Sequence, residues 1–131
     1  MAVLDNGLTK KIWDHIFGTA TFAAITTPVK LKLVTATGSD SAAGTEVSGG
    51  SYAAQNLAMS AATASTRNVT NSGTVSFTGM PACTVTGIDT ADSAGSPLRL
   101  VYGGLASSKT VVAGDTISFA ASSITATFQA G

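Results

Sequence analysis

Few side chains in this 131-residue sequence could do chemistry. His15 is the only histidine, Cys83 is the only cysteine, and the seven acidic residues are scattered along the chain. His15 falls inside a predicted helix, where a partly exposed structural role is expected rather than that of a general base. Cys83 follows the apolar residues 80–82 with no basic neighbour to lower its pKa, so we expect an inert thiol. We therefore predict no catalytic residues and no enzymatic activity.

The sequence also predicts no metal site and no cofactor. A single cysteine forms no intrachain disulfide and no cysteine-rich metal site. Residues 38–51 form a loop in which Asp40 and Glu46 could meet Ca²⁺, but their spacing matches no EF-hand. Gly49 and Gly50 precede a β-like run, residues 52–59, and no Lys-Ser/Thr pair follows, so a phosphate-binding loop is not expected.

Composition favours protein partners. The chain has the length of one domain, only 11% of its residues are charged, and its formal net charge is zero. Without a basic stripe, binding to nucleic acid is not expected. Without a long apolar run or a signal peptide pattern, we expect a soluble, unprocessed chain that binds no membrane. A neutral surface of small residues favours packing against other protein, and we expect a homo-oligomer, a trimer or a dimer.

The N-terminal residues 1–18 are predicted to form an amphipathic helix. Apolar side chains recur every four residues, Asp5 or Asn6 can cap the start, and Gly18 can end the helix. The apolar face must be covered, either by the protein's own sheet or by a neighbouring subunit. The candidate interface residues on this face are Leu4, Leu8, Ile12, Trp13, Ile16 and Phe17.

The remaining residues, 19–131, read as short β-strands joined by turns. Residues 29–34 alternate apolar side chains with Lys30 and Lys32, which we interpret as solvated residues on an outer face that oppose edge-to-edge pairing. Further β runs occupy residues 75–77, 84–88 and 98–102.

At the C-terminus, residues 110–112 and 116–119 flank the Ala-Gly-Asp turn at 113–115, a pattern typical of a hairpin. A third run at 124–128 places Ile124, Ala126 and Phe128 on one face, which predicts a meander. The expected fold is a single, mainly β domain: an antiparallel, jelly-roll-like β-sandwich with one N-terminal α-helix.

Several segments, in order along the chain, resemble small virion proteins of tailed bacteriophages, which are described as tail-fibre-like or capsid decoration proteins. The segments that carry this resemblance are residues 14–19, 29–34, 44–52, 71–72, 85–89, 107–116 and 119–121. The resemblance implies a structural protein of the virion, assembled in the host cytoplasm, that binds the major capsid protein or other virion proteins.

Three roles are compatible with that resemblance. A capsid decoration or cement protein that bridges capsomers is the leading expectation, because no sustained heptad or shaft repeat appears in the sequence. The alternative is a subunit of the tail or tail fibre. A second alternative is a module that binds host-surface glycans. Such a module needs exposed Trp, Tyr and carboxylate side chains clustered in loops, and Tyr52, Tyr102 and the acidic segment 89–92 offer few of them.

Overall fold

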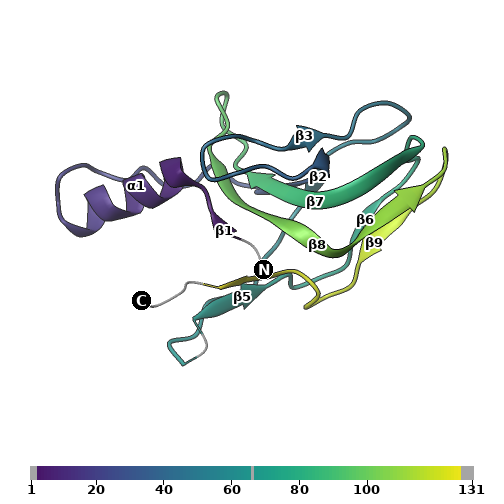
Figure 1. Ribbon diagram of the computed structural model, residues 1–131. Helices are drawn as coiled ribbons and strands as arrows, with labels where there is room; N and C mark the ends of the chain where they lie inside the picture. The colour runs from purple at the N-terminus through teal and green to yellow at the C-terminus, as the bar shows by residue number, and fades with distance from the viewer. Residues whose placement is uncertain (1–2, 66, 128–131) are drawn as a thin grey trace.

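The computed structural model describes residues 3–65 and 67–127, and these are mainly β with a single helix (Figure 1). The paired strands run antiparallel. The predicted fold class, mainly β with antiparallel sheets and one N-terminal helix, is therefore confirmed. In chain order the elements are β1 (Val3–Leu4), α1 (Asn6–Ile16), β2 (Lys30–Ala36), β3 (Thr45–Glu46), β4 (Gln55–Asn56), β5 (Asn68–Thr70), β6 (Val75–Phe77), β7 (Cys83–Ala91), β8 (Arg99–Val111), β9 (Ile117–Phe119) and β10 (Thr125–Thr127).

One layer is a six-stranded sheet in the order β1-β8-β7-β2-β3, with β4 also paired to β2. Leu33 of β2 lies opposite Ile88 of β7 in this sheet. The β7–β8 register shifts between Val85 and Gly87, and β8 bends sharply along its length (Figure 1). Such irregularities strengthen local twist and curve a sheet around its core.

The other layer consists of two short ribbons, β5 with β10 and β6 with β9. The buried core includes side chains from both layers, among them Leu31 and Leu33 of the large sheet and Phe77 and Ile117 of one ribbon. Phe77 is 1% exposed; its ring stacks on Tyr52 at 5.8 Å and meets the edge of Phe119 at 6.3 Å between ring centroids. The two layers thus enclose one aromatic-centred core, as in a β-sandwich.

The predicted C-terminal meander is wrong, although its turn is present. Gly114 has a φ of +91°, and the Val112 N–H donates to the Asp115 carboxylate at 3.0 Å. The flanking strands nevertheless do not pair with each other: β8 pairs with β7, β9 with β6, and β10 with β5.

The reason lies in the partner that the turn itself binds. The Gly114 N–H donates to the Met80 carbonyl at 2.8 Å, and the Met80 N–H donates to the Asp115 carbonyl at 3.0 Å. Met80 is fully buried, so the turn is held against the core and carries the chain from the large sheet to a ribbon. Ile124 is buried as expected, whereas Phe128 lies outside the described residues.

The interpretation of Lys30 and Lys32 as residues that protect a sheet edge is also wrong. Their strand, β2, is interior to the large sheet, with β7 on one side and β3 and β4 on the other. Lys32 forms a 3.0 Å ion pair with Glu46 of β3, and Lys30 donates a hydrogen bond to Asn56 of β4. Both lysines therefore stabilise cross-strand pairing.

Tyr52 joins this sheet to the core and carries a testable pH dependence. Its hydroxyl oxygen accepts the Leu33 N–H at 2.9 Å, and its O–H donates to Glu46 at 3.3 Å. Burial raises the pKa of Tyr52 above its usual value of 10.0, and the Glu46 carboxylate raises it further. Above pH 10 the unfolded chain loses this proton while the folded chain keeps it, so folding stability falls as the pH rises.

We expect Tyr52→Phe to lower the free energy of unfolding at neutral pH by about 1–3 kcal/mol, because it leaves the buried Leu33 N–H without a partner. The folding stability of the variant should also fall less steeply than that of the wild type as the pH rises above 10. Urea unfolding at pH values below and above 10 measures both effects. An alkaline slope equal to that of the wild type would contradict the assignment.

Candidate interaction surface

The N-terminal helix is fastened to the sheet at its first turn. Leu4 of β1 pairs with Val101 of β8, and the Asp5 N–H donates to the Leu100 carbonyl at 2.9 Å. Asp5 caps α1, since its carboxylate accepts the Gly7 N–H at 2.7 Å. The predicted cap is confirmed, but the helix begins at Asn6 and Leu4 belongs to a strand. Strand pairing with β8 replaces helical hydrogen bonding at that residue.

A largely buried arginine holds this first turn in place. Arg99 donates to Asp5 at 3.2 Å, to Asp89 at 3.0 Å and to the Ser39 carbonyl at 2.6 Å. Its guanidinium also lies 4.3 Å from the centre of the Tyr102 ring. The Arg99, Asp5 and Asp89 side chains are 13%, 14% and 7% exposed. We call these four residues, Arg99, Asp5, Asp89 and Tyr102, the Arg99 clamp.

The loop that contains Gly38 and Gly44 packs tightly against the Arg99 clamp, and a side chain at Gly38 would not fit. A Cβ on Gly38 would lie 2.4 Å from the Arg99 guanidinium and 2.6 Å from the Ala42 carbonyl. The Gly44 N–H donates to Asp89 at 2.9 Å. The loop backbone thus packs directly against the charged groups, and any larger residue at Gly38 would displace them.

The acidic segment considered for glycan binding is buried instead. Tyr102, Asp89 and Asp92 are 9%, 5% and 7% exposed. The Tyr102 hydroxyl donates to Asp40, a bond that raises the pKa of Tyr102. Asp92 accepts the Leu98 N–H at 2.8 Å, and this bond lowers the pKa of its carboxyl group. These side chains are buried and bonded to other parts of the chain, so they are not exposed in the way that glycan contact requires.

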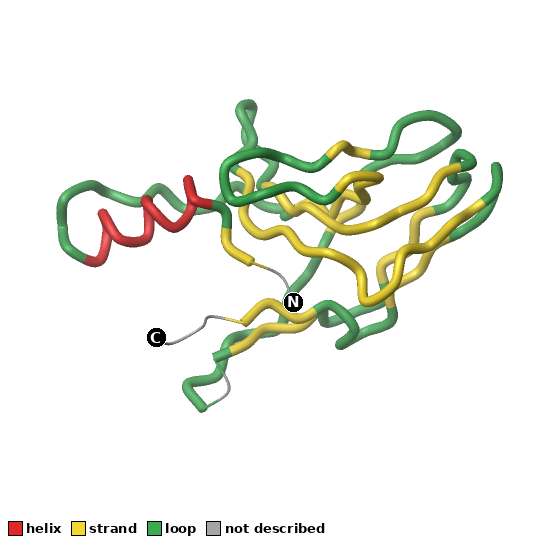
Figure 2. Tube along the Cα trace, viewed as in Figure 1, coloured by secondary structure: helices red, strands yellow, loops and turns green. Residues whose placement is uncertain are grey.

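Beyond its first turn, α1 leaves the body of the molecule. Figure 2 shows the helix and the loop that follows it standing clear of the strands. We call residues 6–29 the arm. The helix ends where Gly18 adopts a φ of +68°, as its position in the sequence predicted. The return segment is tied to the helix: the Phe22 N–H donates to His15 at 3.4 Å, and their ring centroids lie 6.5 Å apart.

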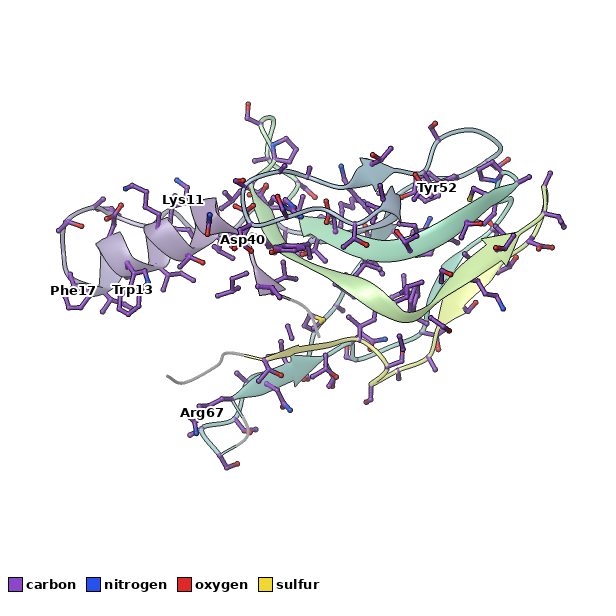
Figure 3. The ribbon with its side chains drawn as sticks, in the orientation of Figure 1. Lys11, Trp13, Phe17, Asp40, Tyr52 and Arg67 are labelled. Carbon is purple, nitrogen blue, oxygen red and sulfur yellow. The ribbon has the colours of Figure 1, made fainter. Side chains whose placement is uncertain are left out.

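The far end of α1 carries three exposed apolar side chains. Trp13, Ile16 and Phe17 are 54%, 61% and 71% exposed. The Trp13 and Phe17 rings stack at 5.6 Å with an interplanar angle of 10°, and Figure 3 shows both at the tip of the arm. We call these three residues the arm patch. Exposed apolar patches of this kind mark interaction sites.

The arrangement divides the predicted interface residues. Leu8 is buried, Leu4 and Ile12 are half-buried, and of these six residues only those of the arm patch are exposed. The expectation that the protein's own sheet covers the whole apolar face is therefore wrong. The second half of the helix extends away from the strands (Figure 1).

A family model described as podophage GP4 fiber I protein gp80 matches residues 4–127, nearly the entire chain. The chain belongs to this family. This confirms the resemblance to tailed-phage virion proteins and makes the chain a structural protein of a phage virion. Among curated proteins, no match was found.

The Cys83 thiol of this gp80-family chain lies against the core. Burial raises the pKa of the Cys83 thiol, and the side chain packs against the core. Among the described residues, no three His, Cys, Asp or Glu side chains are placed to hold a metal ion. Within the same residues, no helix is long and apolar enough to cross a membrane.

Sequence reasoning missed the Arg99 clamp. Arg99 and Asp5 are 94 residues apart in the chain, and no motif links them. The one available signal was that Arg99 is an arginine inside a predicted strand, where an apolar residue would be ordinary.

Proposed function

We propose that this gp80-family chain is a non-catalytic structural subunit of a phage fiber, and that the arm attaches it to a neighbouring virion protein. The observation that carries this proposal is the arm patch, a stacked aromatic pair and an isoleucine exposed at the end of an anchored helix. The family description as a fiber protein supports the fiber over the capsid shell. Nothing in the fold favours capsid decoration.

The Arg99 clamp supports this role because it sets the direction of the arm. An interface element held rigidly before binding loses less conformational entropy on association. Burial of the exposed aromatic area then contributes roughly 25 cal/mol per Å². In a fiber the same contact is repeated, so modest affinities combine through avidity.

Localisation in particles tests the proposal. A gold label on the C-terminal end of the chain should appear on fibers in electron micrographs. A label found on the capsid shell would contradict the fiber assignment.

Substitution of the arm patch tests the role of the arm. Deleting the arm would also remove the buried Leu8 and the helix that Asp5 caps, so we choose the triple variant Trp13→Ser, Ile16→Ser, Phe17→Ser. We expect this variant to occupy fibers about tenfold less than the wild type, because the apolar contact of the arm patch is removed. Lys11→Ser, on the same helix and also exposed, is the matched control. Normal occupancy of the triple variant would contradict attachment through the arm.

A further inference from the structure

We propose that the neighbour contacted by the arm is a second copy of this chain. The arm patch of each copy docks in an apolar groove of the other, and the chain forms a two-fold dimer. The proposal rests on the proposed function, because it names the partner of the same surface.

The groove lies where β1 and β8 face the β5–β10 ribbon. It has a volume of about 270 Å³ and is lined by Leu4, Ala62, Arg67, Val69, Val101 and Ala126, among others. Most of these side chains are aliphatic, and four of them, Leu4, Val69, Val101 and Ala126, are half-buried. Concave sites of this composition bind apolar groups.

The groove has room for the aromatic part of the arm patch. A cavity of about 150 Å³ lined by Leu, Ile and Phe holds benzene. At about 270 Å³, this groove accommodates an indole or a phenyl ring. Arg67 lines the same groove and offers a guanidinium to a ring face, the pairing that aromatic rings favour with cations.

The groove cannot be filled by the arm patch of its own copy. Leu4 lines the groove and lies two residues before α1, whose 11 residues span about 16 Å. The arm patch sits at the far end of that helix, and Figure 3 shows Trp13 and Phe17 at the tip of the arm, apart from Arg67 in the loop that leads into β5. An arm patch that docks in this groove therefore belongs to a second copy.

Buried area favours a reciprocal contact. The exposed fractions of the arm patch leave roughly 370 Å² open if a fully exposed side chain of this size presents about 200 Å². One helix in one groove would then bury about 750 Å² over both partners, below the roughly 1,000 Å² that a specific interface needs. Two such contacts in one dimer bury about 1,500 Å², a standard interface. A two-fold axis pairs each arm patch with the groove of the other copy.

The purified full chain tests the stoichiometry. Light scattering at micromolar concentration should give the mass of a dimer. Trp13 is the only tryptophan, so its fluorescence should shift to shorter wavelength in the dimer and return on dilution as the mass falls. A monomer at all concentrations would overturn the proposal.

Two variants test the two sides of the contact. Phe17→Asp places a charge in the arm patch, and Ala62→Trp fills the groove from an exposed loop position. Both should be monomeric with wild-type circular dichroism. Ala64→Trp, in the same loop but outside the groove lining, should remain a dimer. Retention of the dimer in Ala62→Trp would overturn the groove as the docking site.

Mixing the two variants distinguishes a docking contact from a general loss of structure. Phe17→Asp keeps its groove and Ala62→Trp keeps its arm patch, so one of the two contacts can form between them. Because one contact buries only about 750 Å², this complex should be weak, and an amine cross-linker at high protein concentration should trap more heterodimer in the mixture than dimer in either variant alone. A yield in the mixture no higher than in the separate variants would contradict docking of the arm patch in the groove. These solution measurements are independent of particle labelling. A monomer found on fibers would refute this inference alone, and a dimer absent from fibers would refute the fiber assignment alone.

Discussion

Replacing Arg99 by methionine is expected to lower the free energy of unfolding by about 3–5 kcal/mol. The Asp5 and Asp89 carboxylates would lose their cation while remaining 14% and 7% exposed. Breaking a buried ion pair from one side is costly because it leaves uncompensated charge in a poorly solvated place. Domains of this size are stable by only about 5–15 kcal/mol, so this loss would bring the chain near unfolding.

Urea denaturation of Arg99→Met measures this effect. Arg99→Lys should recover part of the stability, because a lysine keeps the charge but lacks the planar fork that reaches both carboxylates. Lys32→Met is the matched control: its pair with Glu46 is about one-third exposed, and we expect a loss of about 1 kcal/mol or less. Equal losses in Arg99→Met and Lys32→Met would show that the Arg99 clamp has no special role.

The clamp also connects stability to the proposed contact. Asp5 is both the cap of α1 and a partner of Arg99. In Arg99→Met molecules that remain folded, the arm should lose its fixed direction. We therefore expect weaker dimerisation in this variant even though every residue of the arm patch and groove is retained.

Replacing Asn71 by alanine is expected to destabilise the fold by about 3 kcal/mol. Asn71 is fully buried, and its side chain donates to the Gly73 and Ala120 carbonyls at 2.8 Å each. Its carbonyl oxygen accepts the Ile124 N–H at 2.8 Å. The side chain thus holds the connection between β9 and β10 against β5, and alanine would leave a buried N–H of Ile124 unpaired.

Thermal and urea unfolding of Asn71→Ala measure the loss. Asn56→Ala is the control, because Asn56 is exposed and its side chain bonds only Lys30 among the described residues. Asn71→Asp should be at least as damaging as Asn71→Ala, since a carboxylate cannot donate to the two carbonyls and adds a buried charge. A loss below about 1 kcal/mol in Asn71→Ala would mean that solvent or backbone groups replace these bonds.

Local signals were sufficient for the fold class and for most element positions. The Asp5 cap, the Gly18 end and the apolar stripe between them mark a helix through contacts a few residues apart. Alternation at Lys30–Ala36 marks a strand, and the Gly-Asp pair at 114–115 marks a turn, for the same reason. The family resemblance, carried by such turn and strand segments, was also confirmed.

Strand partners could not be derived in this way. Alternation shows that β9 is a strand, but its partner β6 lies about 40 residues earlier, beyond the reach of any turn signal. The same holds for Asn71, a residue singled out only as part of a family segment, whose side chain meets Ala120 and Ile124. Each of these pairings joins residues far apart in the sequence, and such hydrogen bonds form only once the folded structure brings the residues together.

The sequence by itself determined that this protein has a β body and an amphipathic N-terminal helix. It also determined the apolar face of the helix, except that Leu4 belongs to strand β1. Only the tertiary structure decided that Leu8 is covered while Trp13, Ile16 and Phe17 are not. Periodicity defines the face of a helix, but the direction of its axis depends on what holds its first turn. Here Arg99, 94 residues from Asp5, holds that first turn. The rest of the arm stands away from the strands (Figure 1).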